Sequence, residues 1–173
     1  MIDSLKVMIL EDRATDQTLV KRQVLKYNSK SVFSIASDKA SFLKKIDWFL
    51  PDLILADYNL PQFTGLEALV HVKENKPFVP FVFVTGGLHP SDPVAGVVLK
   101  LADGFVLKDN LSSLHKELVD IMKSMDDKIK YHAKITQKQY EKKVQILKNI
   151  ELLDELTSEE KQQKINELLE GLN

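Results

Sequence analysis

Residues 53–61 read LILADYNLP, four apolar residues that run into a single acidic residue, Asp57. Apolar side chains at consecutive rather than alternate positions indicate a strand that is buried on both faces, which is typical of a parallel sheet. A carboxylate at the end of such a strand could cap a helix, form a turn, bind a metal or act as a nucleophile. The residues that end the neighbouring strands distinguish these roles.

Further short apolar runs flank this strand, with helical patterns between them. The runs cover residues 6–10, 31–36, 81–84 and 104–107. Apolar spacing predicts helices over residues 15–27, 38–50, 65–75 and 92–102, and a fifth helix from about Leu111. Asp38 and Asp92 stand at the cap positions of the second and fourth of these helices. Five strands that alternate with five helices predict an α/β fold, a flavodoxin-like doubly wound (βα)5 parallel sheet of order 2-1-3-4-5.

The composition bounds the class of protein. The chain has 173 residues, a formal net charge of −1 and no cysteine. This charge gives no electrostatic reason to expect nucleic acid or an acidic membrane as a partner. The N-terminus lacks a signal-peptide layout, and no apolar run approaches the roughly 20 residues of a membrane helix. Because cysteine is absent, disulfides are excluded. We therefore expect a soluble cytoplasmic protein that binds neither membrane nor nucleic acid.

Polar residues follow the central strands of the predicted sheet. Glu11 and Asp12 follow the first strand, Asp57 the third, Thr85 the fourth and Lys108 the fifth. In an open parallel sheet, ligands bind where the carboxyl ends of the strands meet at the reversal of strand order. Three carboxylates there would repel one another unless a cation lies among them, and oxygen ligands suit Mg²⁺. A carboxylate can also accept a phosphoryl group, with which the lysine could pair.

Together these positions resemble the receiver domain of two-component response regulators. The matching segments are ILED (9–12), LILADYNLPQFTGLEAL (53–69), VTGG (84–87) and ADGFVLKD (102–109). The resemblance covers roughly residues 4–124, and its motifs are specific through their joint order and spacing. It implies that Asp57 accepts a phosphoryl group from a histidine kinase or a phosphotransfer protein.

The resemblance also implies Mg²⁺ as the cofactor and a set of residues that hold it. The side chains of Asp12 and Asp57 would bind the ion directly. Glu11 would bind it through water, and Asn59 through its backbone carbonyl.

Other residues would contact the phosphoryl group or respond to it. Lys108 and Thr85 match the residues that contact the group in the family, and Gly86 leaves room beside it. Thr85 and Phe105 match the pair that switches on phosphorylation, although Phe105 lacks the hydroxyl that a tyrosine would bring. The chain also departs from many receivers at Asp109, where they carry a proline.

One alternative interpretation uses the same aspartate. A phosphatase of the haloacid-dehalogenase type would need a second aspartate two places after Asp57. Asn59 stands there and cannot protonate a leaving group, so we expect a phosphoryl acceptor and not an enzyme that turns over phosphate esters. Asp16 fits an acidic residue in the first turn of a helix, where the helix dipole favours it, and we assign it no role in the site.

The remaining residues, 125–173, predict a helical extension of a receiver domain that spans residues 1–124. A long helix would continue the fifth helix of the receiver, and a short helix would begin at TSEE (157–160), which resembles a capping box. The short helix carries an apolar stripe of Ile165, Leu168, Leu169 and Leu172. A stripe without cover in its own chain favours a homodimer or a hetero-partner over a solvated tail. The extension is too short for a helix-turn-helix domain, which disfavours DNA binding.

The sequence therefore predicts a stand-alone response regulator. Phosphorylation of Asp57 would depend on Mg²⁺ and would modulate a protein–protein interaction or dimerisation. The alternative is a phosphorelay intermediate or a phosphate sink that has no output partner of its own.

Overall fold

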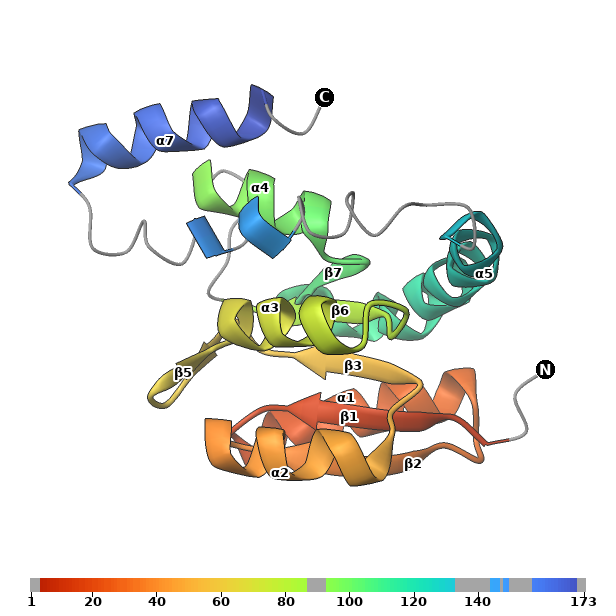
Figure 1. Ribbon diagram of the computed structural model, residues 1–173. Helices are drawn as coiled ribbons and strands as arrows, with labels where there is room; N and C mark the ends of the chain where they lie inside the picture. The colour runs from red at the N-terminus through yellow and green to blue at the C-terminus, as the bar shows by residue number, and fades with distance from the viewer. Residues whose placement is uncertain (1–3, 87–92, 133–143, 147, 150–156, 171–173) are drawn as a thin grey trace.

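A five-stranded parallel sheet forms the centre of the molecule (Figure 1). The computed structural model describes residues 4–86, 93–132, 144–146, 148–149 and 157–170. The strands are β1 (Lys6–Leu10), β2 (Val32–Ala36), β3 (Leu53–Ala56), β6 (Phe81–Thr85) and β7 (Gly104–Leu107). They lie in the order β2-β1-β3-β6-β7. Because β6 and β7 are the fourth and fifth strands of this sheet, the predicted order 2-1-3-4-5 is confirmed.

The register of the strands brings their carboxyl ends to one level. Leu10 pairs with Ala56, so the residues that follow them, Glu11 and Asp57, leave adjacent strands side by side. The backbone N–H of Asp57 still donates to the carbonyl of Leu10 at 2.8 Å, which fixes the residue beside β1. In the next two strands of the sheet, β6 and β7, Thr85 pairs with Leu107. The polar residues predicted to meet at this edge therefore start from aligned backbone positions.

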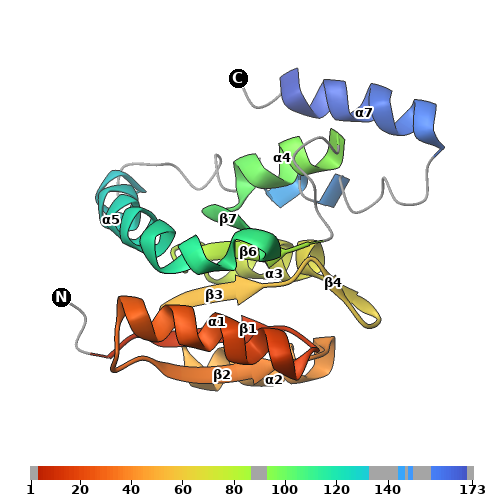
Figure 2. The ribbon, with the colours of Figure 1, turned by 180° about the vertical axis from the view of Figure 1, so that it is seen from behind.

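Helices cover both faces of the sheet (Figures 1 and 2). The helices are α1 (Ala14–Tyr27), α2 (Lys39–Phe49), α3 (Gly65–Asn75), α4 (Pro93–Leu101) and α5 (Leu114–His132). One core cluster lies under α1 and α5 and includes Val24 and Leu118. The other lies under α2, α3 and α4 and includes Phe42, Leu69 and Val98. Every residue of β3 and β6 is buried, as their uninterrupted apolar sequences predict.

Local hydrogen bonds explain where these helices begin. The Asp38 carboxylate accepts from the backbone N–H of Ser41 at 2.8 Å, which confirms the predicted cap of α2. In α3, the hydroxyl of Thr64 accepts from the N–H of Glu67, whose carboxylate accepts in turn from the N–H of Thr64. The predicted cap at Asp92 lies outside the described residues. The predicted start of the fifth helix was wrong, because a 3-10 helix, η1 (Lys108–Ser113), precedes α5.

A small antiparallel hairpin that the sequence did not predict joins β3 to α3. It consists of β4 (Asn59–Leu60) and β5 (Phe63–Thr64). Gln62 lies in the turn of this hairpin and has a φ of 56°, in the left-handed region. Gly65 follows, and a Cβ there would collide with the backbone carbonyl of Asp57 and lie 2.9 Å from the Cα of Tyr58. Only glycine therefore lets α3 begin directly over the end of β3.

The C-terminal part of the chain packs against α4. Helix α7 (Ser158–Glu170) begins where the sequence predicts, and the Glu160 carboxylate accepts from the backbone N–H of Thr157 at 2.9 Å. In Figures 1 and 2, α7 lies along α4, on the side away from the sheet. Ile146 and Ile165 are buried and belong to the same core cluster as Val98 of α4. The expectation that this apolar stripe lacks cover in its own chain was therefore wrong at Ile165.

Other features of the extension stay predictions. Helix α5 continues without a break past residue 124 to His132. The division into a receiver of residues 1–124 and an extension of 125–173 therefore stays a prediction. The side chains of Leu168, Leu169 and Leu172 lie outside the described part.

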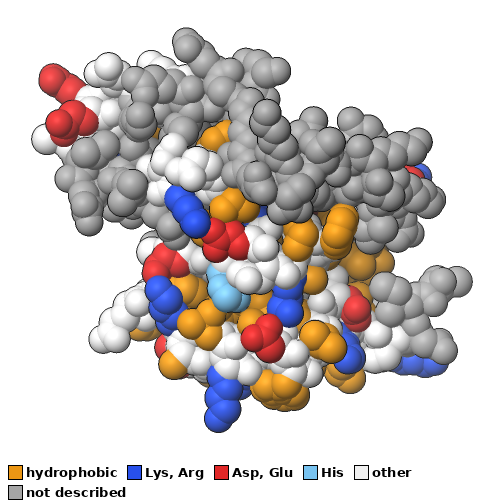
Figure 3. All heavy atoms as spheres, viewed as in Figure 1, with side chains coloured by type: hydrophobic (Ala, Val, Ile, Leu, Met, Phe, Trp, Pro, Cys, Tyr) orange, Lys and Arg blue, Asp and Glu red, His pale blue; other side chains and the backbone are white. Residues whose placement is uncertain are grey.

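The surface carries both signs of charge. On the face in Figure 3, acidic, basic and hydrophobic side chains are interspersed over the described residues. This mixture agrees with the net charge of −1. Within the described ranges, no helix combines the length and the apolar character needed to cross a membrane.

Candidate functional site

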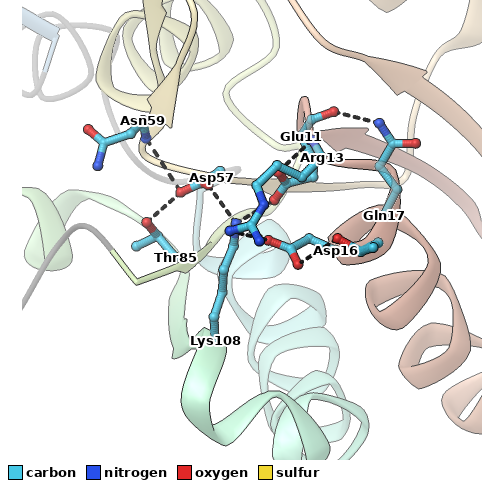
Figure 4. A network of polar contacts seen from close by, with 9 residues as sticks. Glu11, Arg13, Asp16, Gln17, Asp57, Asn59, Thr85 and Lys108 are labelled. Atoms are coloured by element: carbon cyan, nitrogen blue, oxygen red, sulfur yellow. Dashed lines mark hydrogen bonds and ion pairs between the residues drawn. The ribbon is translucent and has the colours of Figure 1, made fainter.

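The side chain of Lys108 lies among three carboxylates at the carboxyl edge of the sheet (Figure 4). Its Nζ lies 2.6 Å from Oε2 of Glu11, 2.6 Å from Oδ2 of Asp57 and 2.8 Å from Oδ2 of Asp16. An ammonium group has three N–H donors and no acceptor, so each donor has one carboxylate partner. This one cation therefore offsets the repulsion among the three acids.

Asp57 accepts hydrogen bonds at both of its carboxylate oxygens. Oδ2 accepts from Lys108, while Oδ1 accepts from the hydroxyl of Thr85 at 2.5 Å and from the backbone N–H of Asn59 at 3.4 Å. Thr85 is fully buried, but the side chain of Asp57 remains 11% exposed. An incoming group can therefore reach this carboxylate from solvent.

The chain holds these groups from five separate elements. Glu11 and Asp57 are the first residues after β1 and β3, Thr85 ends β6, Lys108 begins η1 after β7, and Asp16 lies in the first turn of α1. The Glu11 carboxylate also accepts from the backbone N–H of Arg13 at 3.0 Å, and the Gln17 amide donates to the Glu11 carbonyl. These hydrogen bonds join the start of α1 to the end of β1 and so place Asp16 close to Lys108.

Burial and hydrogen bonding shift the pKa values of these groups in opposite directions. Burial raises the pKa of Glu11, whose side chain is 2% exposed, although Lys108 opposes this effect. The hydrogen bond from Lys108 lowers the pKa of Asp16. Burial alone would lower the pKa of Lys108, but its hydrogen bonds to Asp16, Asp57 and Glu11 raise it well above its ordinary value. Lys108 is therefore a permanent cation in this pocket.

The comparisons with known proteins agree with this geometry. The family model described as the response regulator receiver domain matches residues 7–120. The chain belongs to this family. Its members are response regulators of two-component signalling.

Curated relatives match over the receiver region. Chemotaxis protein CheY of Listeria monocytogenes is 27% identical over 104 residues, which are 60% of this chain and 86% of CheY. The alkaline phosphatase synthesis transcriptional regulatory protein PhoP of Bacillus subtilis is 31% identical over 106 residues, which are 60% of this chain but 42% of PhoP. The match therefore spans less than half of PhoP and most of CheY.

Solved structures share the receiver fold. Chemotaxis response regulator CheY4 of Vibrio cholerae has a TM-score of 0.58 and 24% identity, over 68% of this chain and 98% of that chain. The Mn²⁺-bound form of response regulator Rcp1 has a TM-score of 0.52 and 23% identity, over 66% of this chain and 91% of that chain. At these identities the likeness supports the fold alone.

The receiver fold brings four of the predicted site residues into contact, namely Glu11, Asp57, Thr85 and Lys108. Asp12 is exposed and is not among the carboxylates that contact the ammonium. The other predicted residues lie close in sequence or packing without joining this network through their side chains.

The roles predicted for Asn59, Gly86 and Phe105 stay predictions. Asn59 reaches Asp57 through its backbone N–H, and its carbonyl is the group that the sequence assigns to a metal. Gly86 is exposed, and among the described residues no heavy atom outside Gly86 and its chain neighbours lies within 4 Å of the position that a Cβ would take. Phe105 is half-buried and packs against the core cluster beneath α2, α3 and α4.

The sequence missed Asp16 as a member of the site. It does lie in the first turn of α1, as expected, but its carboxylate also contacts Lys108, 92 positions away. The available signal was an acid in the first turn of the helix that follows β1, close in sequence to Glu11. Strand-end positions alone could not reveal it.

No group of three His, Cys, Asp or Glu side chains in the described ranges is arranged around a common metal position. The ammonium of Lys108 is the cation on which the acids converge. Their donor atoms are all carboxylate oxygens, which fit Mg²⁺ in chemistry and charge.

Replacement of Lys108 by methionine should destabilise the protein, because three carboxylates would lose their shared cation. We expect a loss of about 3 kcal/mol in the free energy of unfolding at pH 7, measured by urea denaturation. Lys116→Met, which removes an exposed lysine of α5, should change it by less than about 0.5 kcal/mol.

The deficit of Lys108→Met should shrink as the pH falls. Without Lys108 the pKa of Glu11 would lie further above its unfolded value of 4.5. The folded state would then bind more protons than the unfolded state, so its stability rises relative to the wild type between pH 7 and 4.5. A deficit that does not change with pH would contradict this assignment of the charges.

Proposed function

We propose that this receiver is the phosphoryl acceptor of a two-component system, with Asp57 as the acceptor and a kinase or phosphotransfer phosphohistidine as the donor. The observation that carries the proposal is the set of donors around one accessible carboxylate. Thr85 donates to one oxygen of Asp57 and Lys108 to the other. These donors are placed to contact the oxygens of a group that becomes attached there.

The proposed transfer needs few protein groups. A carboxylate oxygen of Asp57 attacks phosphorus, a P–O bond forms, and the P–N bond to the donor imidazole breaks with its electron pair left on nitrogen. Lys108 and Thr85 then donate to the transferred phosphoryl oxygens. Because Asn59 cannot act as a general acid, the acyl phosphate would be the product of the transfer and not an intermediate of ester turnover.

The residues present fit a divalent cation in this reaction. Asp12 and Asp57 would hold Mg²⁺ through their side chains, Asn59 through its carbonyl and Glu11 through water. The ion when bound would offset the negative charge of the phosphoryl oxygens. Two features support the assignment. Two acids of this set, Glu11 and Asp57, share one monovalent cation, and a solved structure of this fold, Rcp1, is a Mn²⁺-bound form.

Incubation with acetyl phosphate and MgCl₂ should add one phosphoryl group to the wild type, measured by intact mass. Asp57→Asn should gain none, because the nucleophilic oxygen is replaced by an amide. Asp120→Asn, which removes an exposed acid of α5, should react like the wild type. Omission of MgCl₂ in the presence of EDTA should abolish the gain. Equal gains by the wild type and Asp57→Asn, or none by either, would contradict the proposal.

We further propose that α4 and the C-terminal segment packed on it carry the output. Thr85 is both the hydrogen-bond donor to Asp57 and the last residue of β6, the strand that precedes α4 in the chain. Helix α4 in turn shares a buried cluster with Ile146 and Ile165. Lys148 adds an ion pair to Glu74 of α3 at 2.5 Å.

The direction of this response follows from the packing. In this structure Asp57 is unmodified and accepts from the Thr85 hydroxyl, and α4 packs against α7. A phosphoryl group would redirect that hydroxyl, and a displaced α4 would lose part of its packing with Ile165. Phosphorylation should therefore loosen α7 and expose its apolar face to a second copy or to another protein. A phosphate sink would not require this coupling, so the packed segment favours a switch.

Hydrogen exchange should report the release. Phosphorylation should raise exchange in both α4 and α7 of the wild type. Ile165→Asp should show high exchange in both helices without phosphorylation, because a buried apolar contact is replaced by a charge. Gln163→Asp, which adds the same charge at an exposed position of α7, should behave like the wild type.

A phosphorylated wild type whose exchange in α4 and α7 stays unchanged would contradict the coupling. Because intact mass measures phosphorylation independently, that result would leave the assignment of Asp57 in place.

A further inference from the structure

Asp16 is a carboxylate of the pocket that comes from a helix and not from a strand end. Its Oδ2 lies 2.8 Å from Nζ of Lys108, and its side chain is 14% exposed. Arg13 lies 3.7 Å from the same oxygen, but the Arg13 side chain is 68% exposed. Lys108 is therefore the principal partner of Asp16 (Figure 4).

A role in forming α1 does not explain this contact. The residue at the N-cap position of α1 is Arg13, and no side chain caps the helix there. The dipole of α1 favours a negative charge anywhere in the first turn, including one that points to solvent. The side chain of Asp16 instead reaches the ammonium group that also binds Glu11 and Asp57.

Entry of a divalent ion would disturb the contacts of Lys108. The ammonium contacts Glu11 and Asp57, two of the acids that would hold Mg²⁺. A second cation, bound directly to Asp57 and through water to Glu11, would repel the ammonium and compete for these carboxylates. Lys108 must then give up at least one of these contacts, and a buried ammonium without acceptors is costly. Of the three carboxylates that it contacts, Asp16 is the one outside the proposed metal set.

We propose that Asp16 is a positioning residue for Lys108. Asp16 holds the ammonium on the α1 side of the pocket when Mg²⁺ binds to Glu11 and Asp57, and so raises the affinity of the site for the ion. The inference rests on the Mg²⁺ site of the proposed function. It adds that the affinity of that site depends on a carboxylate that does not ligate the ion.

Titration with MgCl₂ at constant ionic strength, without a phosphodonor, tests this role. Two-dimensional NMR would follow the backbone amide signals of Asp57 and Asn59. Asp16→Asn should bind Mg²⁺ about tenfold more weakly than the wild type, because Lys108 loses a charged acceptor and competes harder for the metal carboxylates. Asp16→Glu should restore most of the affinity, and Asp120→Asn should leave it unchanged.

The same titration in a Lys108→Met background separates positioning from direct ligation. If Asp16 acts through Lys108, the loss caused by Asp16→Asn should be smaller without the lysine than with it. Equal losses in the two backgrounds would mean that Asp16 acts on the ion itself, which would overturn the proposal. Unchanged or tighter binding by Asp16→Asn would overturn it as well.

Failure of the inference and failure of the proposed function are distinguishable in this experiment. A wild type whose pocket signals do not respond to MgCl₂ would overturn the proposed metal site and the inference together. A wild type that responds while Asp16→Asn responds equally would overturn the inference alone.

Discussion

The ammonium group of Lys108 compensates the charge of three acids that the fold places at one edge of the sheet. Parallel strands in register deliver Glu11 and Asp57 side by side, and α1 adds Asp16. Charged hydrogen bonds of this kind contribute roughly 1.5–3 kcal/mol each, while uncompensated buried carboxylates would cost several kcal/mol. The site is thus a cluster of acids around one ammonium group, and the proposed phosphoryl transfer would change the partners of that ammonium.

The packing around the pocket connects it to the rest of the molecule. Gly65 allows α3 to begin against the backbone of Asp57, the proposed acceptor. Thr85 connects the acceptor to the end of β6, which the chain follows into α4. Helix α4 is not free at the surface, because Ile165 of α7 is buried in the same cluster. The proposed response to phosphorylation would therefore act on a surface that the chain itself already covers.

The fold and most of the site could be predicted from the sequence because they depend on local patterns. Uninterrupted apolar runs such as residues 53–56 predicted buried parallel strands, and the residues after them predicted the meeting of Glu11, Asp57 and Lys108. The hairpin of β4 and β5 was missed because it is only two residues on each side. Helix and strand periodicities carry little signal over so short a span.

Two further features depend on contacts between distant residues. Asp16 and Lys108 are 92 positions apart, and the first-turn position of Asp16 had a sufficient explanation in the helix dipole. The apolar stripe of α7 indicated that something covers it, but periodicity does not identify the cover. The structure places Ile165 against α4 of the same chain, whereas the sequence favoured a second chain.

The position of the phosphoryl group is the most direct test of the account, because several acids share the pocket. Reduction of the phosphorylated protein with borohydride converts an acyl phosphate of aspartate to homoserine, which peptide mass spectrometry locates in the sequence. We expect homoserine at position 57 alone. Modification at Asp12 or Asp16 with position 57 intact would contradict it.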